Sequence, residues 1–221
     1  MPSLLYYDQD GNFKEAGFAV LGEHTTRVAE TEGWTRAEWL VVRCVQAPTC
    51  SLVKHRWKLH LRPNHLAASI NMQDGLPPLP SGKPAVDVLT DFIRYLFQCA
   101  KTYIQDSHPG FTWPIVEHSI EYIFTHPNGW EGRQQDYRRA IEHAGLVSST
   151  PEGMSRIHML TEGEASLHFC VSRLLSKGAA DQTLPHGVAV IDAGGATINL
   201  SMYSVTTNPI HCEEIAPAEC M

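Results

Sequence analysis

The sequence predicts an α/β fold, because segments typical of strands and of helices alternate along most of the chain. In Ala85–Gln105, apolar side chains recur every three or four residues, which indicates an amphipathic helix. Short apolar segments with strand character stand between the helical ones. The 221 residues, 43% of them apolar and 19% charged, are typical of a globular chain with a substantial core.

The first residues predict a hairpin followed by a helix. Ser3–Asp8 alternates weakly and leads into the turn sequence QDGN, which predicts a strand paired with Phe13–Ala16. Gly17–Glu32 then has a helical pattern, and Gly33 is expected to end that helix.

Further elements continue the alternation after the long helix. Glu162 and Glu164 are expected just before one of these helices or in its first turn. Cys99 and Cys170 lie in predicted helices with apolar neighbours and are expected in the core. The expected elements are, in order, the strand Ser119–Thr125, the helix Gln134–Ala144 closed by Gly145, the strand Ile157–Leu160, the helix Ala165–Leu175 and the buried strand Val188–Ile191.

The net charge, the lack of a long apolar run and the spacing of the cysteines argue against some classes of protein. The net charge of −7 argues against nucleic acid as a partner, because phosphate binding needs a basic surface. No apolar run approaches the length of a membrane span, and the first residues do not resemble a signal peptide. The six cysteines are scattered without a CxxC pair, which predicts reduced thiols in a cytoplasmic protein.

The stretch VAVIDAGGATINLSMYS, residues 188–204, carries the most chemical information. Its second half alternates with period two, so a hairpin rather than a strand–helix unit is expected, with its tip at residues 193–196. Gly194 and Gly195 would let a phosphate approach the backbone N–H groups closely. Asp192 could hold a water or a metal-bound water beside it, and Thr197 adds a hydroxyl. An ordinary hairpin with small turn residues remains the alternative.

The segment VIDAGGATINLSMYS resembles the second phosphate motif of the actin-like ATPase superfamily, in particular that of the DnaK-type, seventy-kilodalton heat-shock proteins. Further segments match this family in the same order. IFTHPNGWEGRQQDYRRAIEHAGL resembles its strand, loop and helix, and LTEGEASLHFC resembles its connecting helix. DFIRYLFQCAKTYIQD and LYYDQDGNFKEAGFAVL are similar to a divergent branch that is widespread in fungi.

The resemblance implies an incomplete ribonuclease-H-like, actin-like ATPase fold. Residues 1–186 would be a partial first lobe, and residues 187–221 would begin the second lobe with its phosphate hairpin. In this family ATP and magnesium lie between the two lobes. The implied site consists of Glu162, which helps to orient the attacking water, Asp192 on the hairpin, Gly194, Gly195, Ala196 and Thr197 on the phosphates, and Asn199, which with Asp192 would contact magnesium through water.

Two of these positions depart from the family pattern, and one has a simpler interpretation. Ala196 replaces a glycine and Asn199 replaces an aspartate. Glu162 could instead stabilise a helix N-terminus by about 0.3–1 kcal/mol, and Glu164 is expected to do only that.

Parts of the family's machinery are also expected to be missing: the first phosphate hairpin, the catalytic lysine and the adenosine motif. Weak ATP binding is therefore expected, without effective hydrolysis by this chain alone. The alternatives are a non-catalytic pseudo-ATPase that pairs with another protein or a fuller relative, and an incomplete gene product.

Residues 40–56 interrupt the chain between Trp39 and Trp57, where relatives of the fungal branch continue directly. A retained intron or gene-model error is one hypothesis, and an added strand or exposed apolar patch at Leu40–Val45 is another. A zinc site is a third, but its cysteines and histidines do not have the usual zinc spacing. The side chains that would bind zinc are Cys44, Cys50, His55, His60 and His65.

Overall fold

The computed structural model describes residues 2–38, 57–63, 79–110, 112–176, 187–193, 198–207 and 210–220. They combine helices with small sheets, which confirms the predicted α/β class. The segment 40–56, with Cys44, Cys50 and His55, lies outside the described residues, as does His65, whereas His60 lies in the short 3₁₀ helix Trp57–Leu61.

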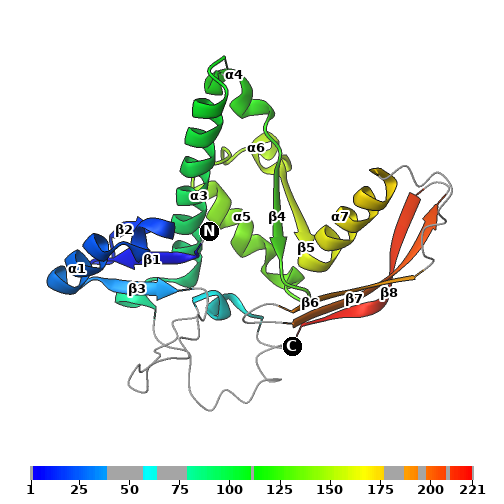
Figure 1. The fold of residues 1–221 in the computed structure, drawn as a ribbon, viewed down its shortest axis with the longest axis horizontal. Coiled ribbons are helices and arrows are strands. Elements are labelled where there is room, and N and C mark those ends of the chain that lie inside the picture. Colours follow the sequence, from blue (N-terminus) through cyan, green and yellow to red (C-terminus); the bar gives the residue numbers. More distant parts are fainter. Residues whose placement is uncertain are drawn as a thin grey trace, which may run out of the picture. The chain divides into compact units, whose positions relative to one another are not determined.

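The described residues form two compact units (Figure 1). The predicted boundary between two lobes, at residues 186 and 187, is implied by the resemblance to the family. The two units do not test it, so it stays a prediction. Unit 1 takes its residues from Met1–Arg62, Asn71–Glu121 and Gln135–Arg156, and unit 2 takes its residues from Pro63–Ile70, Tyr122–Gln134 and Ile157–Met221.

The predicted N-terminal hairpin is confirmed in unit 1. Strand β1 (Leu4–Tyr7) pairs antiparallel with β2 (Phe13–Ala16) on one side and with β3 (Thr35–Glu38) on the other. In the turn, Asp8 Oδ1 accepts hydrogen bonds from the backbone N–H groups of Asp10 (3.0 Å) and Asn12 (2.8 Å). Lys14 Nζ lies 2.9 Å from Asp8 Oδ2. The hydrogen bonds from Lys14 and Asn12 hold the pKa of Asp8 well below its usual range.

The helix expected over Gly17–Glu32 divides in two. A 3₁₀ turn, Gly17–Leu21, comes first, and helix α1 (Glu23–Glu32) follows it. Gly22 separates the two because its backbone is extended, with φ −71° and ψ 137°. The expected end is confirmed, since Gly33 adopts the left-handed conformation, φ 68°, that favours glycine after a helix.

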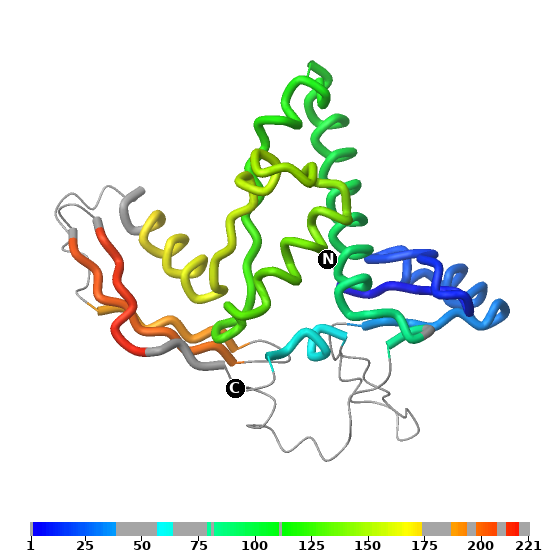
Figure 2. The backbone as a smooth tube through the Cα atoms, turned by 180° about the vertical axis from the view of Figure 1, so that it is seen from behind, coloured from blue at the N-terminus to red at the C-terminus, as the bar shows by residue number. Residues whose placement is uncertain are grey.

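The predicted long helix is confirmed as α3 (Ala85–Ser107), and a lysine joins it to the N-terminal sheet. Lys83 Nζ donates to the Gly11 carbonyl (3.0 Å) and to Asp91 Oδ2 on the helix (2.7 Å), and it lies 4.4 Å from the centre of the Tyr7 ring. Figure 2 shows the N-terminal strands beside this end of α3. One side chain therefore connects the hairpin turn, β1 and the helix.

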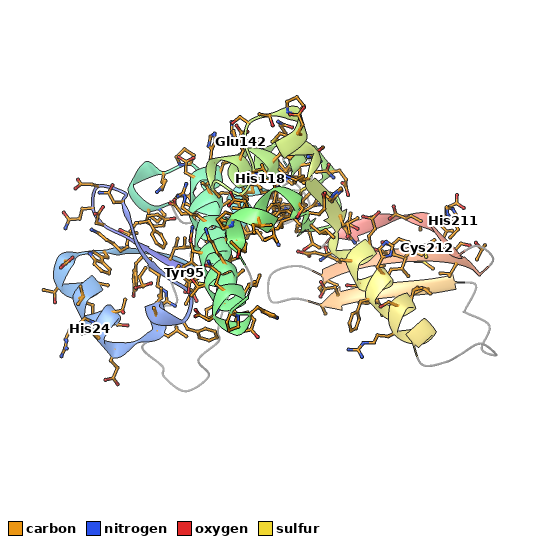
Figure 3. The ribbon with its side chains drawn as sticks, turned by 90° about the horizontal axis from the view of Figure 1, so that it is seen from above. His24, Tyr95, His118, Glu142, His211 and Cys212 are labelled. Atoms are coloured by element: carbon orange, nitrogen blue, oxygen red, sulfur yellow. The ribbon has the colours of Figure 1, made fainter. Side chains whose placement is uncertain are left out.

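Two tyrosines of unit 1 predict a loss of stability at alkaline pH. Burial, aided by the Asp91 carboxylate, raises the pKa of Tyr7 well above its usual value. Burial, aided by Cys99, raises the pKa of Tyr95 to about 12. Tyr95 is labelled in Figure 3. Both tyrosines should contribute fully to the free energy of unfolding below about pH 10, the pH at which tyrosine in the unfolded chain ionises. This contribution should decrease as the pH rises towards 12.

Denaturant unfolding measured between pH 8 and pH 12 checks this prediction. Tyr7→Phe should flatten the alkaline loss, whereas the control Tyr103→Phe, at an exposed side chain, should keep it. Equal slopes in wild type and Tyr7→Phe would contradict the assignment.

Three further helices belong to unit 1: α4 (Trp113–Val116), α5 (Gln134–His143), which begins at the boundary of the units, and α6 (Pro151–Ser155). Helix α5 and its closing glycine were predicted, and Gly145 has φ 83°. Arg94 Nη2 on α3 donates to the His143 carbonyl at the end of α5 (2.7 Å).

Unit 2 contains a pair of parallel strands, β4 (Tyr122–His126) and β5 (Ile157–Thr161), and an antiparallel sheet of β6 (Gly187–Ala193), β7 (Ile198–Thr207) and β8 (Ile210–Cys220). Helix α7 (Glu162–Ser176) covers one face of that sheet (Figure 1). The core between the helix and the sheet, here called the α7 core, consists of Leu167, Val171, Tyr203 and Val205. Val188, Val190 and Cys212 of the sheet pack against it.

Three expectations about burial were wrong, and one strand was not predicted. Val188–Ile191 is a strand but not a buried one, since β6 lies at the edge of its sheet and Ile191 is 68% exposed on the face away from α7. Cys170 is exposed and Cys99 half-buried. Strand β8 was not predicted, because its Pro217 and its acidic residues disfavour a strand.

Among the described helices, none combines the length with the hydropathy that crossing a bilayer requires.

Candidate functional site

The junction between β5 and α7 brings the first predicted acid into position. Thr161 Oγ1 accepts from the Glu164 backbone N–H (3.0 Å), and Glu164 Oε2 accepts from the Thr161 backbone N–H (2.8 Å). This reciprocal pair is a capping box, which satisfies two donors at the helix start. The helix-capping role expected for Glu164 is confirmed.

Removing the capping hydroxyl should weaken the junction. Thr161→Ala is expected to lower the free energy of unfolding by about 1 kcal/mol, the usual cost of losing such a cap. Thr161→Ser keeps the acceptor oxygen and should remain close to wild type. Chemical denaturation of the three proteins measures the difference, and equal midpoints for Ala and wild type would contradict it.

Glu162 contacts the predicted phosphate hairpin directly. Its Oε2 accepts a hydrogen bond of 2.8 Å from Asn199 Nδ2 on β7. Asn199 is only 2% exposed and Glu162 is half-buried, so this bond between a carboxylate and an amide is partly shielded from water. Hydrogen bonds to charged groups are worth about 1.5–3 kcal/mol. The contact therefore ties the first residue of α7 to the hairpin.

Asp192 lies beside this pair. In the β6–β7 ladder it stands directly opposite Asn199, and directly opposite residues share one face of a sheet with their Cβ atoms about 5 Å apart. That face is the one α7 covers, because Val190 and Tyr203 on it pack into the α7 core. Three predicted site residues, Glu162, Asp192 and Asn199, are thus brought together in unit 2.

The Asn199 amide has an unused acceptor. Carboxylate oxygens accept and do not donate, so the NH₂ group of Asn199 must face Glu162 and the carbonyl oxygen must face elsewhere. Asn199 Oδ1 is buried and has no hydrogen-bond partner among the described residues. Burying an acceptor without a donor costs about 1–3 kcal/mol. A water or a metal-bound water that donated to this oxygen would offset that cost.

The glycine turn itself lies outside the described residues, so Gly194, Gly195, Ala196 and Thr197 stay predictions. Strands β6 and β7 are antiparallel and pair as far as Ala193 and Ile198, which confirms the predicted hairpin. Ala193 was expected at the tip, but it pairs as the last residue of β6. Within the described part of the chain, no three histidine, cysteine or acidic side chains form a group that could bind a metal directly.

Asn128, in the loop after β4, joins the same elements and was not predicted as a site residue. Its Nδ2 donates to Ser201 Oγ on β7 (2.7 Å), and its Oδ1 accepts from the Gly163 backbone N–H on α7 (3.3 Å). Gly163 leaves no room for a side chain, because a Cβ there would overlap Ser201 Oγ. A polar HPN segment directly after a strand was the one sequence signal that could have indicated this role.

His126, the last residue of β4, holds the same loop. Its Nδ1 lies 2.9 Å from the Pro127 carbonyl, and its Nε2 lies 3.0 Å from Gln134 Nε2. A carbonyl only accepts, so Nδ1 carries the proton, and Nε2 accepts from the Gln134 amide. Both ring nitrogens are engaged and the ring is buried, so this histidine helps to hold the loop that carries Asn128.

The fold and this site together describe an α/β protein with two carboxylates and a buried amide where a strand–helix junction meets a hairpin. Comparison with models of known protein families found no match, and a search of curated proteins found no similar sequence. The resemblance to the actin-like ATPases therefore rests on the sequence motifs alone and stays a prediction.

Proposed function

We propose that this chain binds ATP and magnesium through unit 2, as a cytoplasmic, heat-shock-protein-like module of the actin-like ATPase type. The hydrogen bond between Glu162 and Asn199 carries the proposal, because it brings the start of the connecting helix to the hairpin that resembles a phosphate motif. Asp192 lies opposite Asn199 on the same face. Two carboxylates beside a glycine turn suit a phosphate ligand that carries a metal ion.

The side chains fit magnesium held through its waters. Magnesium retains several waters in proteins and prefers oxygen ligands. Glu162 and Asp192 supply carboxylates that can accept from such waters, and Asn199 Oδ1 is a buried acceptor with no donor among the described residues. The ion, when bound, would neutralise charge on the transferred phosphoryl group. The chain's own residues would orient its waters and hold the phosphates at the hairpin.

Hydrolysis should be slow. Asn199 is neutral where the resembled family has an aspartate, and Ala196 replaces a glycine of the turn. Removing one preorganised group that stabilises a transition state costs on the order of a hundredfold in rate or more. The proposal is therefore a nucleotide-binding module with weak or no turnover of its own.

Calorimetric titration with ATP, with and without magnesium, tests the proposal. A dissociation constant of about 1 mM is expected, which corresponds to a binding free energy of about −4 kcal/mol. Binding should require magnesium. Asp192→Asn should weaken it about tenfold, whereas Glu213→Gln, at an exposed carboxylate of β8, should leave it unchanged. Absence of heat up to millimolar ATP would end the proposal for this chain.

A second candidate function, a non-catalytic interaction protein, is favoured by the outer face of the β6–β7–β8 sheet. The side chains on the face away from α7 include several exposed apolar ones, and a protein surface seldom gathers these without a partner. They are Ile191, Ile198, Met202 and Ile215.

Light scattering after size exclusion tests this second candidate. Association of wild type is expected, and Ile191→Thr combined with Met202→Thr should abolish it. Leu21→Thr, at an exposed apolar residue of unit 1, is the matched control and should still associate. A monomer at all concentrations would count against it.

A further inference from the structure

Among the described polar side chains of unit 2, Asn128 is the most completely buried, with an exposed fraction of 0%. A buried amide is costly unless its donor and acceptor are both used. In this position they are, and the partners come from two elements that are distant in sequence, α7 and β7. The side chain therefore does more than fill space in the loop after β4.

The orientation of the Asn128 amide follows from its partners. The Gly163 backbone N–H can only donate, so the carbonyl Oδ1 must face it, at 3.3 Å. The NH₂ group then faces β7, where it donates to Ser201 Oγ (2.7 Å) and approaches the Leu200 carbonyl (3.4 Å). Asn128 is thus a bridge between the second residue of α7 and the middle of β7.

This bridge runs beside the candidate site. Gly163 follows Glu162 in the chain, and Ser201 lies two residues beyond Asn199 on the same face of β7. The α7 core holds the body of the helix against the sheet, and the hydrogen bond between Glu162 and Asn199 joins its first residue to β7. The bridge through Asn128 is a second polar connection between the start of α7 and β7, and it restrains this end of the helix further.

We infer that Asn128 is a positioning residue, which through Gly163 and Ser201 fixes the Glu162 carboxylate against the Asn199 amide and so sets where Asn199 Oδ1 points. The inference deepens the proposed function and rests on it for its purpose, namely to keep two oxygen acceptors in place for the waters of a magnesium–ATP ligand. The positioning itself is a property of the protein without ligand. It can therefore be measured separately.

Nuclear magnetic resonance of the Asn199 side-chain amide is the ligand-free readout. In wild type its two N–H signals should show hydrogen bonding to Glu162, and Asn128→Ala should shift them towards those of a free amide. Asn128→Asp keeps the acceptor for Gly163 N–H and can accept from the Ser201 hydroxyl, but it loses the donor that faces the Leu200 carbonyl, so it should shift the signals less than Asn128→Ala does. Thr90→Val is the matched control, because it removes a buried hydroxyl bonded only within α3 (2.8 Å to Val86).

Unchanged Asn199 signals in a folded Asn128→Ala protein would overturn the inference. If that variant does not fold, Ser201→Ala removes the other end of the bridge with little change in volume, and the same two outcomes apply. Titration with ATP and magnesium is the second readout, with about tenfold weaker binding expected for Asn128→Ala. Wild type that binds no ATP, but whose Asn199 signals depend on Asn128, would refute the proposed function and leave the positioning role standing.

Discussion

Replacing Gly163 with alanine is expected to lower the free energy of unfolding by about 3 kcal/mol, towards the upper end of the cost of overpacking. The new Cβ would overlap Ser201 Oγ and would lie 3.0 Å from the Tyr203 hydroxyl. Ser201 cannot simply rotate away without losing its bond from Asn128. The start of α7 must move instead, so the bond between Glu162 and Asn199 should be lost as well.

Gly187→Ala is the matched control for this prediction. Gly187 lies in β6 of the same unit, and an added Cβ there would meet no described atom within 4 Å. Unfolding in urea, followed by circular dichroism, should place Gly187→Ala near wild type and Gly163→Ala far below it. Equal midpoints for the two variants would mean that α7 does not pack on β7 as described.

Leu167→Ala is expected to have a comparable or larger effect, about 2–5 kcal/mol. Leu167 is 2% exposed at the centre of the α7 core, where it packs with Val171, Tyr203 and Val205. Truncation removes apolar burial and leaves a cavity, and both terms add to the cost. Because this core holds α7 against the sheet, Glu162 should also lose its fixed place beside the hairpin.

Phe169→Ala provides the comparison on the same helix. Phe169 is 59% exposed, so truncating it should change the free energy of unfolding by less than about 1 kcal/mol, although more atoms are removed. A larger loss for Phe169→Ala than for Leu167→Ala would show that the opposite face of α7 is the packed one. Thermal unfolding of both variants, compared at matched concentration, decides between these outcomes.

Much of the local structure could be predicted because it depends on neighbours in the chain. The pattern of α3, the glycine that ends α1 and the hairpin of β1 and β2 follow from apolar spacing and turn residues. The capping box of Glu164 is a four-residue signal of the same kind. The break at Gly22 was missed because a glycine in a helical pattern does not by itself reveal an extended backbone.

Three residues of the candidate site could be predicted from the sequence, but the hydrogen bonds that join its elements could not. Glu162, Asp192 and Asn199 were identified from a resemblance, and the structure brings these three together. Asn128 and Ser201 were missed because a bridge between residues 73 apart in sequence leaves no periodic signal.

By itself, the sequence determined that residues 198–207 form a strand whose side chains alternate between two faces. Only the tertiary structure decided which face is covered. Hydropathy alone would bury Ile198 and Met202, yet these are exposed, and Asn199 and Ser201 are buried. The reason is physical: α7 and the loop after β4 bring Glu162 and Asn128 to this face, and their hydrogen bonds offset much of the cost of burying its polar groups.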